Sequence, residues 1–191
     1  MARTKVIEAG EQTRPARLID AVVQHMRQGE GAESSIITGD VAGARDYIST
    51  QCLALDLALN MPGIPVGRLT VVRGWESSGK SSLVTHILAE TVRRGGVAVL
   101  LDAEFTFDED RSARMGLARE DLLLAQPETM EEAIRLIEKS IKAIREQTPD
   151  ALATIVWDSV GGTPTKSEIE GEFGDSKAIG AHAKLISQAL R

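Results

Sequence analysis

The sequence predicts an α/β fold in which a parallel β-sheet is flanked by helices. Three observations support this prediction. Short apolar runs rich in β-branched residues alternate with segments of helical periodicity from residue 69 onward. A glycine-rich loop joins the first apolar run to the first helix of this series. Acidic residues follow two of the later runs, at the strand ends where open α/β sheets bind their ligands.

The composition indicates a protein with a full apolar core and without a membrane segment. Of the 191 residues 42 % are hydrophobic, and the formal net charge is −6, which argues against a surface coated with basic patches. The one cysteine, Cys52, excludes an internal disulfide and suits a reducing compartment. We find no apolar run of signal-peptide or membrane-spanning type, and we expect a soluble, cytoplasmic protein with no membrane partner.

Residues 1–47 are predicted to form an appendage with one helix and a short strand near Ile36. The helix carries an apolar stripe at spacings of three and four residues and is followed by the polar linker Gly29–Glu33; the stripe comprises Leu18, Ile19, Val22, Val23 and Met26. The stripe either packs on its own domain or docks on a neighbouring subunit, and the linker supports docking. Residues 48–191 are predicted to form the core.

Within the core, residues 48–67 are expected to form a loop, a helix and a second loop. Four parallel strands are expected at residues 69–73, 97–101, 122–124 and 152–157. The first helix is expected to end at Gly95-Gly96, and a later one to begin at Thr129, with Glu132 completing a capping box. Helices are also expected at residues 109–115 and from 177 to the end, after a turn-rich acidic loop at residues 161–176.

The loop after the first predicted strand has the pattern of a P-loop. Residues 74–81 spell G-W-E-S-S-G-K-S. Such a loop turns successive backbone N–H groups toward a phosphate at the positive end of a helix. Lys80 is placed to reach β- and γ-phosphates, and the Ser81 hydroxyl to ligate Mg²⁺. The alternative is a Gly/Ser-rich turn with a chance lysine, and the strand–loop–helix context favours phosphate. The predicted nucleotide-binding residues of the loop are Gly74, Glu76, Ser77, Ser78, Gly79, Lys80, Ser81 and Ser82.

Two carboxylates at strand ends are candidates for the chemistry of a bound nucleotide. Asp158 follows an apolar strand, where it would serve a Mg²⁺ site or cap the next turn. Glu104 lies two residues beyond a neighbouring strand, and would orient or deprotonate a water molecule or remain a solvated loop residue. Spacing alone leaves both choices open, and Asp102 and Asp108 are weaker candidates.

Several motifs together resemble the bacterial RecA recombinase family and its phage relatives. Besides the P-loop they are D-A-E at Asp102–Glu104, Q-P-E-T at Gln126–Thr129, I-V-W-D-S-V at Ile155–Val160 and E-I-E-G-E-F-G-D-S at Glu168–Ser176. The similarity runs in order from about Ile48 to Arg191. The nine-residue acidic run is far more specific than a P-loop. Before Ile48 the similarity is only positional.

The resemblance implies an ATP- and Mg²⁺-dependent recombinase that forms a helical filament on single-stranded DNA and pairs it with homologous duplex DNA. It implies a water-activating role for Glu104, assisted by Lys80, and metal binding by Ser81 and Asp158. Arg111 stands where the family has an adenine-stacking tyrosine, and we place it and Asp108 among the cofactor-binding residues. The loop at 161–176 becomes a DNA-facing loop, with phosphate contacts expected from Lys184, Ser187 and Arg191.

The sequence also departs from the family. Lys184 stands, after a one-residue insertion, where the family has an arginine, and the family continues beyond the position of Arg191 with more strands and a second DNA loop. We therefore expect the 191-residue chain to bind ATP without DNA-stimulated turnover or strand exchange. Two other functions stay open. One is a non-catalytic nucleotide-binding subunit or truncated paralogue that joins or regulates a filament. The other is a small-molecule kinase, which needs an arginine-rich lid that we do not find.

Overall fold

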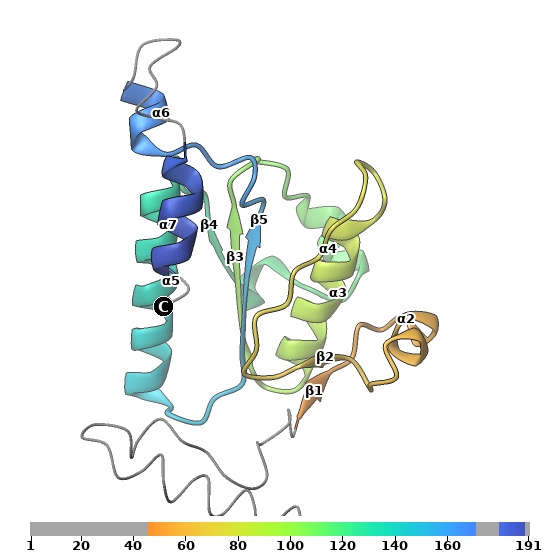
Figure 1. Cartoon of the computed structure of the whole chain (residues 1–191). Helices are drawn as coiled ribbons and strands as arrows, with labels where there is room; N and C mark the ends of the chain where they lie inside the picture. The colour runs from red at the N-terminus through yellow and green to blue at the C-terminus, as the bar shows by residue number, and fades with distance from the viewer. Residues whose placement is uncertain (1–45, 171–179, 190–191) are drawn as a thin grey trace, which may run out of the picture. The chain divides into compact units, whose positions relative to one another are not determined.

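The computed structural model describes residues 46–170 and 180–189. The predicted N-terminal helix, the strand near Ile36 and Arg191 lie outside these ranges. Figure 1 shows the described elements, which are in chain order β1 (Tyr47–Ile48), α2 (Leu53–Ala58), β2 (Ile64–Pro65), α3 (Lys80–Arg93), β3 (Val97–Asp102), α4 (Glu109–Arg114), the 3₁₀ turn η1 (Arg119–Asp121), β4 (Leu122–Ala125), α5 (Met130–Gln147), β5 (Ala153–Asp158), α6 (Lys166–Glu170) and α7 (Ala181–Ala189).

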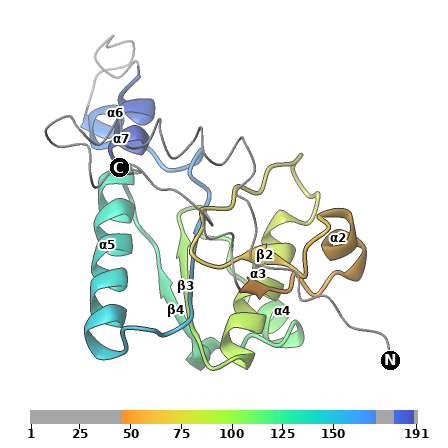
Figure 2. The ribbon, with the colours of Figure 1, turned by 60° about the horizontal axis from the view of Figure 1, so that its bottom comes forward.

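The predicted α/β fold is confirmed by a parallel sheet with helices on both faces. Its order is β4-β3-β5, and β3 pairs in parallel with both neighbours. Helices α3 and α4 lie on one side of this sheet and α5 and α7 on the other (Figures 1 and 2). β1 and β2 form a separate antiparallel pair that the sequence patterns did not predict. None of the helices described is long and apolar enough to cross a membrane.

The strand β3 lies at the centre of the core because both its faces are covered. Successive side chains of a strand point to opposite faces of the sheet. Accordingly, Ala98 and Leu100 pack with Leu88 of α3, whereas Val99 and Leu101 pack with Ala133 of α5. All six are buried, so the continuous apolar run of β3 follows from cover on both faces. This packing fixes the end of β3, where the candidate site begins.

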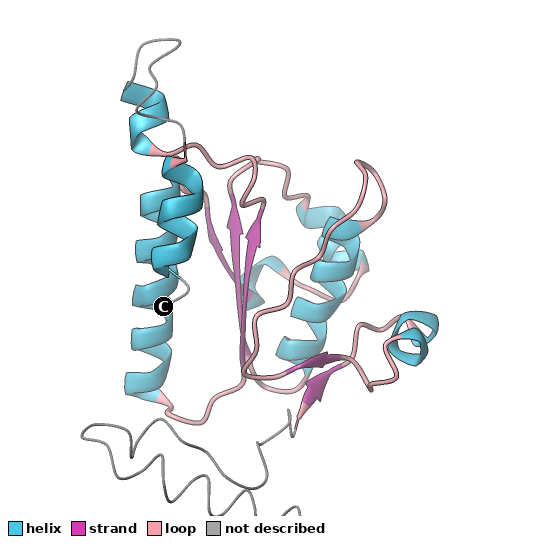
Figure 3. Cartoon of the chain, in the orientation of Figure 1, coloured by secondary structure: helices cyan, strands magenta, loops and turns pink. Residues whose placement is uncertain are grey.

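The predicted strand at residues 69–73 is not formed, so the described residues build a parallel sheet of three strands and not four. This segment is a loop that leads into the P-loop, and Figure 3 shows it as loop. Leu69 and Val71 are each 70 % exposed. Strand propensity describes how a side chain fits a half-buried pleated surface, and a strand also requires a paired backbone. Within the described ranges the segment has no ladder partner.

The predicted C-terminal cap of α3 is confirmed, and the predicted capping box of α5 is confirmed in part. After α3, the N–H of Gly95 donates to the carbonyl of Val92 at 2.8 Å and that of Gly96 to Thr91 at 2.9 Å, which is the Schellman arrangement. At the start of α5, the Glu132 N–H donates to Thr129 Oγ1 at 3.2 Å. The Glu132 carboxylate accepts from the N–H of Glu128, one residue before the cap, so the predicted capping box is only half formed.

The predicted loop at 161–176 contains a short helix, α6, which the analysis of the sequence missed. Thr165 and Glu168 form a reciprocal capping box: the Thr165 N–H donates to Glu168 Oε2 at 2.7 Å, and the Glu168 N–H donates to Thr165 Oγ1 at 3.2 Å. The backbone N–H of Thr165 and its hydroxyl hold the pKa of Glu168 below its usual value. The T-x-x-E pattern was visible in the sequence. Residues 171–179 lie outside the description, and the final helix is described from Ala181.

Candidate nucleotide-binding site

The candidate site lies where β3 and β5 end and α3 begins. Gly79 precedes the first residue of α3 and has φ 90°, a left-handed conformation that costs least for glycine. Ser77 also has a positive φ, of 56°. These two residues turn the chain sharply before α3, and the N-terminal N–H groups of a helix are the groups that bind phosphate. The predicted loop residues Gly74, Glu76, Ser77, Ser78 and Gly79 are all exposed.

Lys80 folds back over its own loop. Its Nζ donates to the carbonyl of Trp75 at 2.9 Å and to that of Gly74 at 3.2 Å. The ammonium group therefore already lies above the loop where a phosphate would bind. Both acceptors are neutral, so a phosphate oxygen would replace them as a stronger, charged partner. The phosphate-binding role of Lys80 stays a prediction from the motif.

Ser81 and Asp158 meet, although 77 positions separate them in the sequence. Ser81 Oγ donates to Asp158 Oδ2 at 2.9 Å. The helix α3 supplies the hydroxyl and the end of β5 supplies the carboxylate. Both groups are hard oxygen donors, the type that Mg²⁺ prefers. The described residues hold no group of three or more His, Cys, Asp or Glu side chains that could bind a metal ion.

Glu104 lies at the same edge of the sheet and is joined to β5 by Ser159. The Ser159 hydroxyl donates to Glu104 Oε1 at 2.6 Å and accepts from the Gly162 N–H at 3.0 Å. A Cβ at Gly162 would lie 2.9 Å from Ser159 Oγ and 3.0 Å from Glu104 Oε1, so a larger residue here would displace one of these two side-chain ends. The peptide bond between Asp158 and Ser159 is cis. Sequence reasoning missed Ser159 and Gly162, and the only signal was that both closely follow Asp158.

Asp102, a weaker candidate for catalysis, serves the structure of the turn that carries Glu104. Its side chain is buried, and its carboxylate accepts from the N–H groups of Thr106 at 3.1 Å and Phe107 at 3.0 Å. Gln126 reaches the same carboxylate from the end of β4, at 3.4 Å. The buried charge is thus satisfied by backbone donors and an amide. Asp102 fixes the turn, and Glu104 remains exposed beside it.

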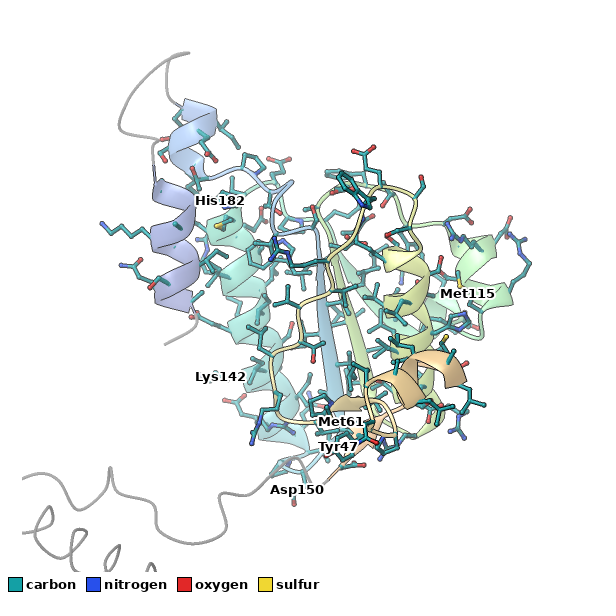
Figure 4. All side chains as sticks on the ribbon, turned by 45° about the vertical axis from the view of Figure 1, so that its right-hand side comes forward. Tyr47, Met61, Met115, Lys142, Asp150 and His182 are labelled. Atoms are coloured by element: carbon teal, nitrogen blue, oxygen red, sulfur yellow. The ribbon has the colours of Figure 1, made fainter. Side chains whose placement is uncertain are left out.

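Asp108 and Arg111 line a pocket next to the start of α3. Asp108 is the N-cap of α4, and its Oδ1 accepts from the Arg111 N–H at 2.9 Å. The Arg111 guanidinium contacts the hydroxyl of Ser82 on α3. Ser81, Asp158 and Met115, the residue that follows α4, also line this pocket, and Figure 4 labels Met115. The structure therefore brings the predicted cofactor residues Ser82, Asp108 and Arg111 together beside Ser81 and Asp158.

The predicted DNA-contact residues lie on a different element. Lys184 and Ser187 are exposed on α7, which packs against α5, and Arg191 lies outside the described residues. His182, labelled in Figure 4, connects α7 to the segment after β5 by a 3.0 Å contact between Nε2 and the carbonyl of Thr163. Thr163 in turn donates through its hydroxyl to the carbonyl of Ser159 at 2.7 Å. α7 is therefore joined to the candidate site through these contacts.

The parallel sheet, the phosphate-type loop before α3 and the Ser81–Asp158 pair define the class of P-loop α/β proteins. Comparison with protein families gives the particular family: the RecA N-terminal domain matches residues 17–191. The chain belongs to the RecA family.

Curated proteins with similar sequences support this assignment. Protein RecA of Clostridium acetobutylicum is 40 % identical over 177 residues, which cover 92 % of this chain and 48 % of that protein. Protein RecA of Herpetosiphon aurantiacus is 46 % identical over 146 residues, covering 76 % of this chain and 39 % of the relative. Protein RecA of Allochromatium vinosum is 40 % identical over 184 residues, covering 95 % and 50 %. The chain thus spans about half the length of the curated relatives it matches.

Proposed function

We propose that this chain binds ATP with Mg²⁺ and hydrolyses it, as the ATPase part of a recombinase of RecA type. The observation that carries the proposal is the 2.9 Å contact between Ser81 and Asp158, because it brings a P-loop hydroxyl and a strand-end carboxylate into one metal-binding pair. Family membership supports the same function.

Different residues at this edge of the sheet are proposed to bind the phosphates, the metal ion and the nucleoside of ATP. Lys80 exchanges its two carbonyl partners for β- and γ-phosphate oxygens, and the N–H groups at the start of α3 bind the same phosphates. Ser81 and Asp158 hold Mg²⁺, which when bound neutralises charge on the phosphates. Asp108 and Arg111 lie on the pocket wall and bind the nucleoside side of ATP.

Hydrolysis requires a positioned water molecule, and Glu104 is the residue proposed to position it. It is exposed, and Ser159 holds its carboxylate at the end of β5 beside the metal pair. Glu104 orients this water and accepts its proton as the γ-phosphate is attacked. Lys80 stabilises the charge that develops on the transferred group.

The proposed DNA function follows from the family. Single-stranded DNA, homologous duplex DNA and further copies of the chain in a filament are the proposed partners. Lys184 and Ser187 lie exposed on α7 and are proposed, with Arg191, to contact DNA phosphates. Residues 1–47 are proposed to dock on the neighbouring subunit, and residues 48–191 to form the ATPase core.

ATP turnover with and without single-stranded DNA tests the proposal. Release of phosphate that requires Mg²⁺ and stops in Lys80→Ala supports an ATPase. ATP binding without any turnover, under both conditions, would replace the ATPase by a non-catalytic nucleotide-binding subunit. Phosphate transfer to an added small molecule would indicate a kinase.

A further inference from the structure

One hydroxyl at the candidate site has a double role that neither the motif nor the proposed function assigns. Ser159 is the residue after Asp158, and its Oγ takes part in two hydrogen bonds. It donates to Glu104 Oε1 at 2.6 Å and accepts the Gly162 N–H at 3.0 Å. Because Gly162 occupies an acceptor position of this oxygen, the hydroxyl proton is directed toward the carboxylate.

We infer that Ser159 is a positioning residue for Glu104, and that the backbone N–H of Gly162 sets the orientation of its hydroxyl. The inference rests on the proposed function, in which Glu104 orients the attacking water. Glu104 is an exposed side chain on a turn, and such a side chain samples several rotamers unless something holds it. A charge-assisted bond of 2.6 Å from a hydroxyl selects one carboxylate position.

The segment that directs Ser159 is itself anchored from two sides. The Thr163 hydroxyl donates to the Ser159 carbonyl at 2.7 Å and accepts from the indole of Trp157 at 2.9 Å. His182 of α7 contacts the Thr163 carbonyl. Thr163 is buried, so the surrounding residues restrict the position of its side chain. Thr163 and Ser159 therefore link α7 to Glu104 through a continuous series of contacts.

The two adjacent glycines of this segment provide a matched pair of variants. A Cβ at Gly162 would crowd both Ser159 Oγ and Glu104 Oε1, at 2.9 and 3.0 Å. A Cβ at Gly161 would meet nothing within 4 Å. Neither glycine has a positive φ, so alanine fits the backbone at both positions. Gly162→Ala thus perturbs the Ser159–Glu104 contact directly, and Gly161→Ala controls for the loss of glycine.

The first test measures the position of Glu104 without nucleotide. Three-bond NMR couplings across the Cα–Cβ bond of Glu104 report its rotamer populations in the 191-residue chain. We expect one dominant rotamer in the wild type and in Ser159→Thr, and averaged couplings in Ser159→Ala and Gly162→Ala. Averaged couplings in the wild type, or one unchanged rotamer in folded Ser159→Ala, would overturn the inference.

The second test separates nucleotide binding from turnover. We expect kcat to fall about tenfold in Ser159→Ala and Gly162→Ala, with the Kd for ATP unchanged within about twofold, because an oriented water matters only in the transition state. Ser159→Thr and Gly161→Ala should retain turnover. Equal kcat in all four variants would refute the positioning role. A wild type without turnover would refute the proposed hydrolysis, and the rotamer measurement would still decide the role of Ser159.

Discussion

Replacing Lys80 by alanine should weaken ATP binding by at least tenfold while leaving the fold intact. Lys80 Nζ donates hydrogen bonds to two neutral carbonyls, those of Gly74 and Trp75. A hydrogen bond to a neutral group contributes about 0.5–1.5 kcal/mol and one to a charged group about 1.5–3 kcal/mol. Exchanging carbonyls for phosphate oxygens therefore gains about 1.4 kcal/mol or more, which is a tenfold change in Kd. The two carbonyls belong to exposed loop residues, so water replaces the ammonium group in the variant.

The assay is a calorimetric titration of the chain with ATP in the presence of Mg²⁺, which measures the Kd for ATP. Lys142→Ala is the matched control, because Lys142 is an exposed lysine on α5, visible in Figure 4, whose contact is a 3.8 Å pair with Glu146. This control should bind ATP as the wild type does. Equal affinity in Lys80→Ala and Lys142→Ala would refute the assignment of the P-loop.

Three further predictions concern turnover, pH and association. Glu104→Gln should lower ATP hydrolysis about 10²-fold or more with little change in ATP affinity, and loss of affinity with intact turnover would contradict the role of Glu104. Glu90 is buried, and hydrogen bonds from the Arg93 guanidinium hold its pKa below the usual 4.5. The ion pair between Glu90 and Arg93 therefore stabilises the fold at neutral pH, and its contribution is lost as the pH falls through the lowered pKa. In urea unfolding Glu90→Gln should therefore be less stable than the wild type at pH 7, and the difference should shrink below about pH 4.5; a constant difference would exclude the ion pair as its cause. Deleting residues 1–33, which lie outside the described structure, should shift sedimentation toward the monomer with the core still folded, and unfolding instead would place the apolar stripe in its own core.

The sequence predicted the fold class because its signals are local and repeated. The apolar runs at β3, β4 and β5 and the cap after α3 each depend on neighbours within a few positions. The segment at 69–73 has the same local signal but no backbone partner in the described structure, and pairing is not a local property. The short pair of β1 and β2 was missed because two residues carry no periodicity.

The candidate site was predictable only in part, for a related reason. The motif predicted Lys80 and Ser81, and the strand-end position predicted Asp158 and Glu104. The sequence could not show that Asp102 would be buried and satisfied by the turn, because that depends on how residues 106 and 107 fold back. Ser159 was missed because its hydrogen bond to Glu104 forms only when the ends of β3 and β5 lie side by side.

The central claim is that Lys80, Ser81 and Asp158 form one site for Mg²⁺ and ATP. Calorimetric titration of the 191-residue chain with ATP, in Mg²⁺ and again in excess chelator, tests this claim most directly, with Asp158→Asn measured in parallel. We expect saturable binding of one ATP per chain that weakens at least tenfold without Mg²⁺, and a much smaller effect of Mg²⁺ in Asp158→Asn. Binding of equal strength with and without Mg²⁺ in the wild type, or no saturable binding at all, would contradict it.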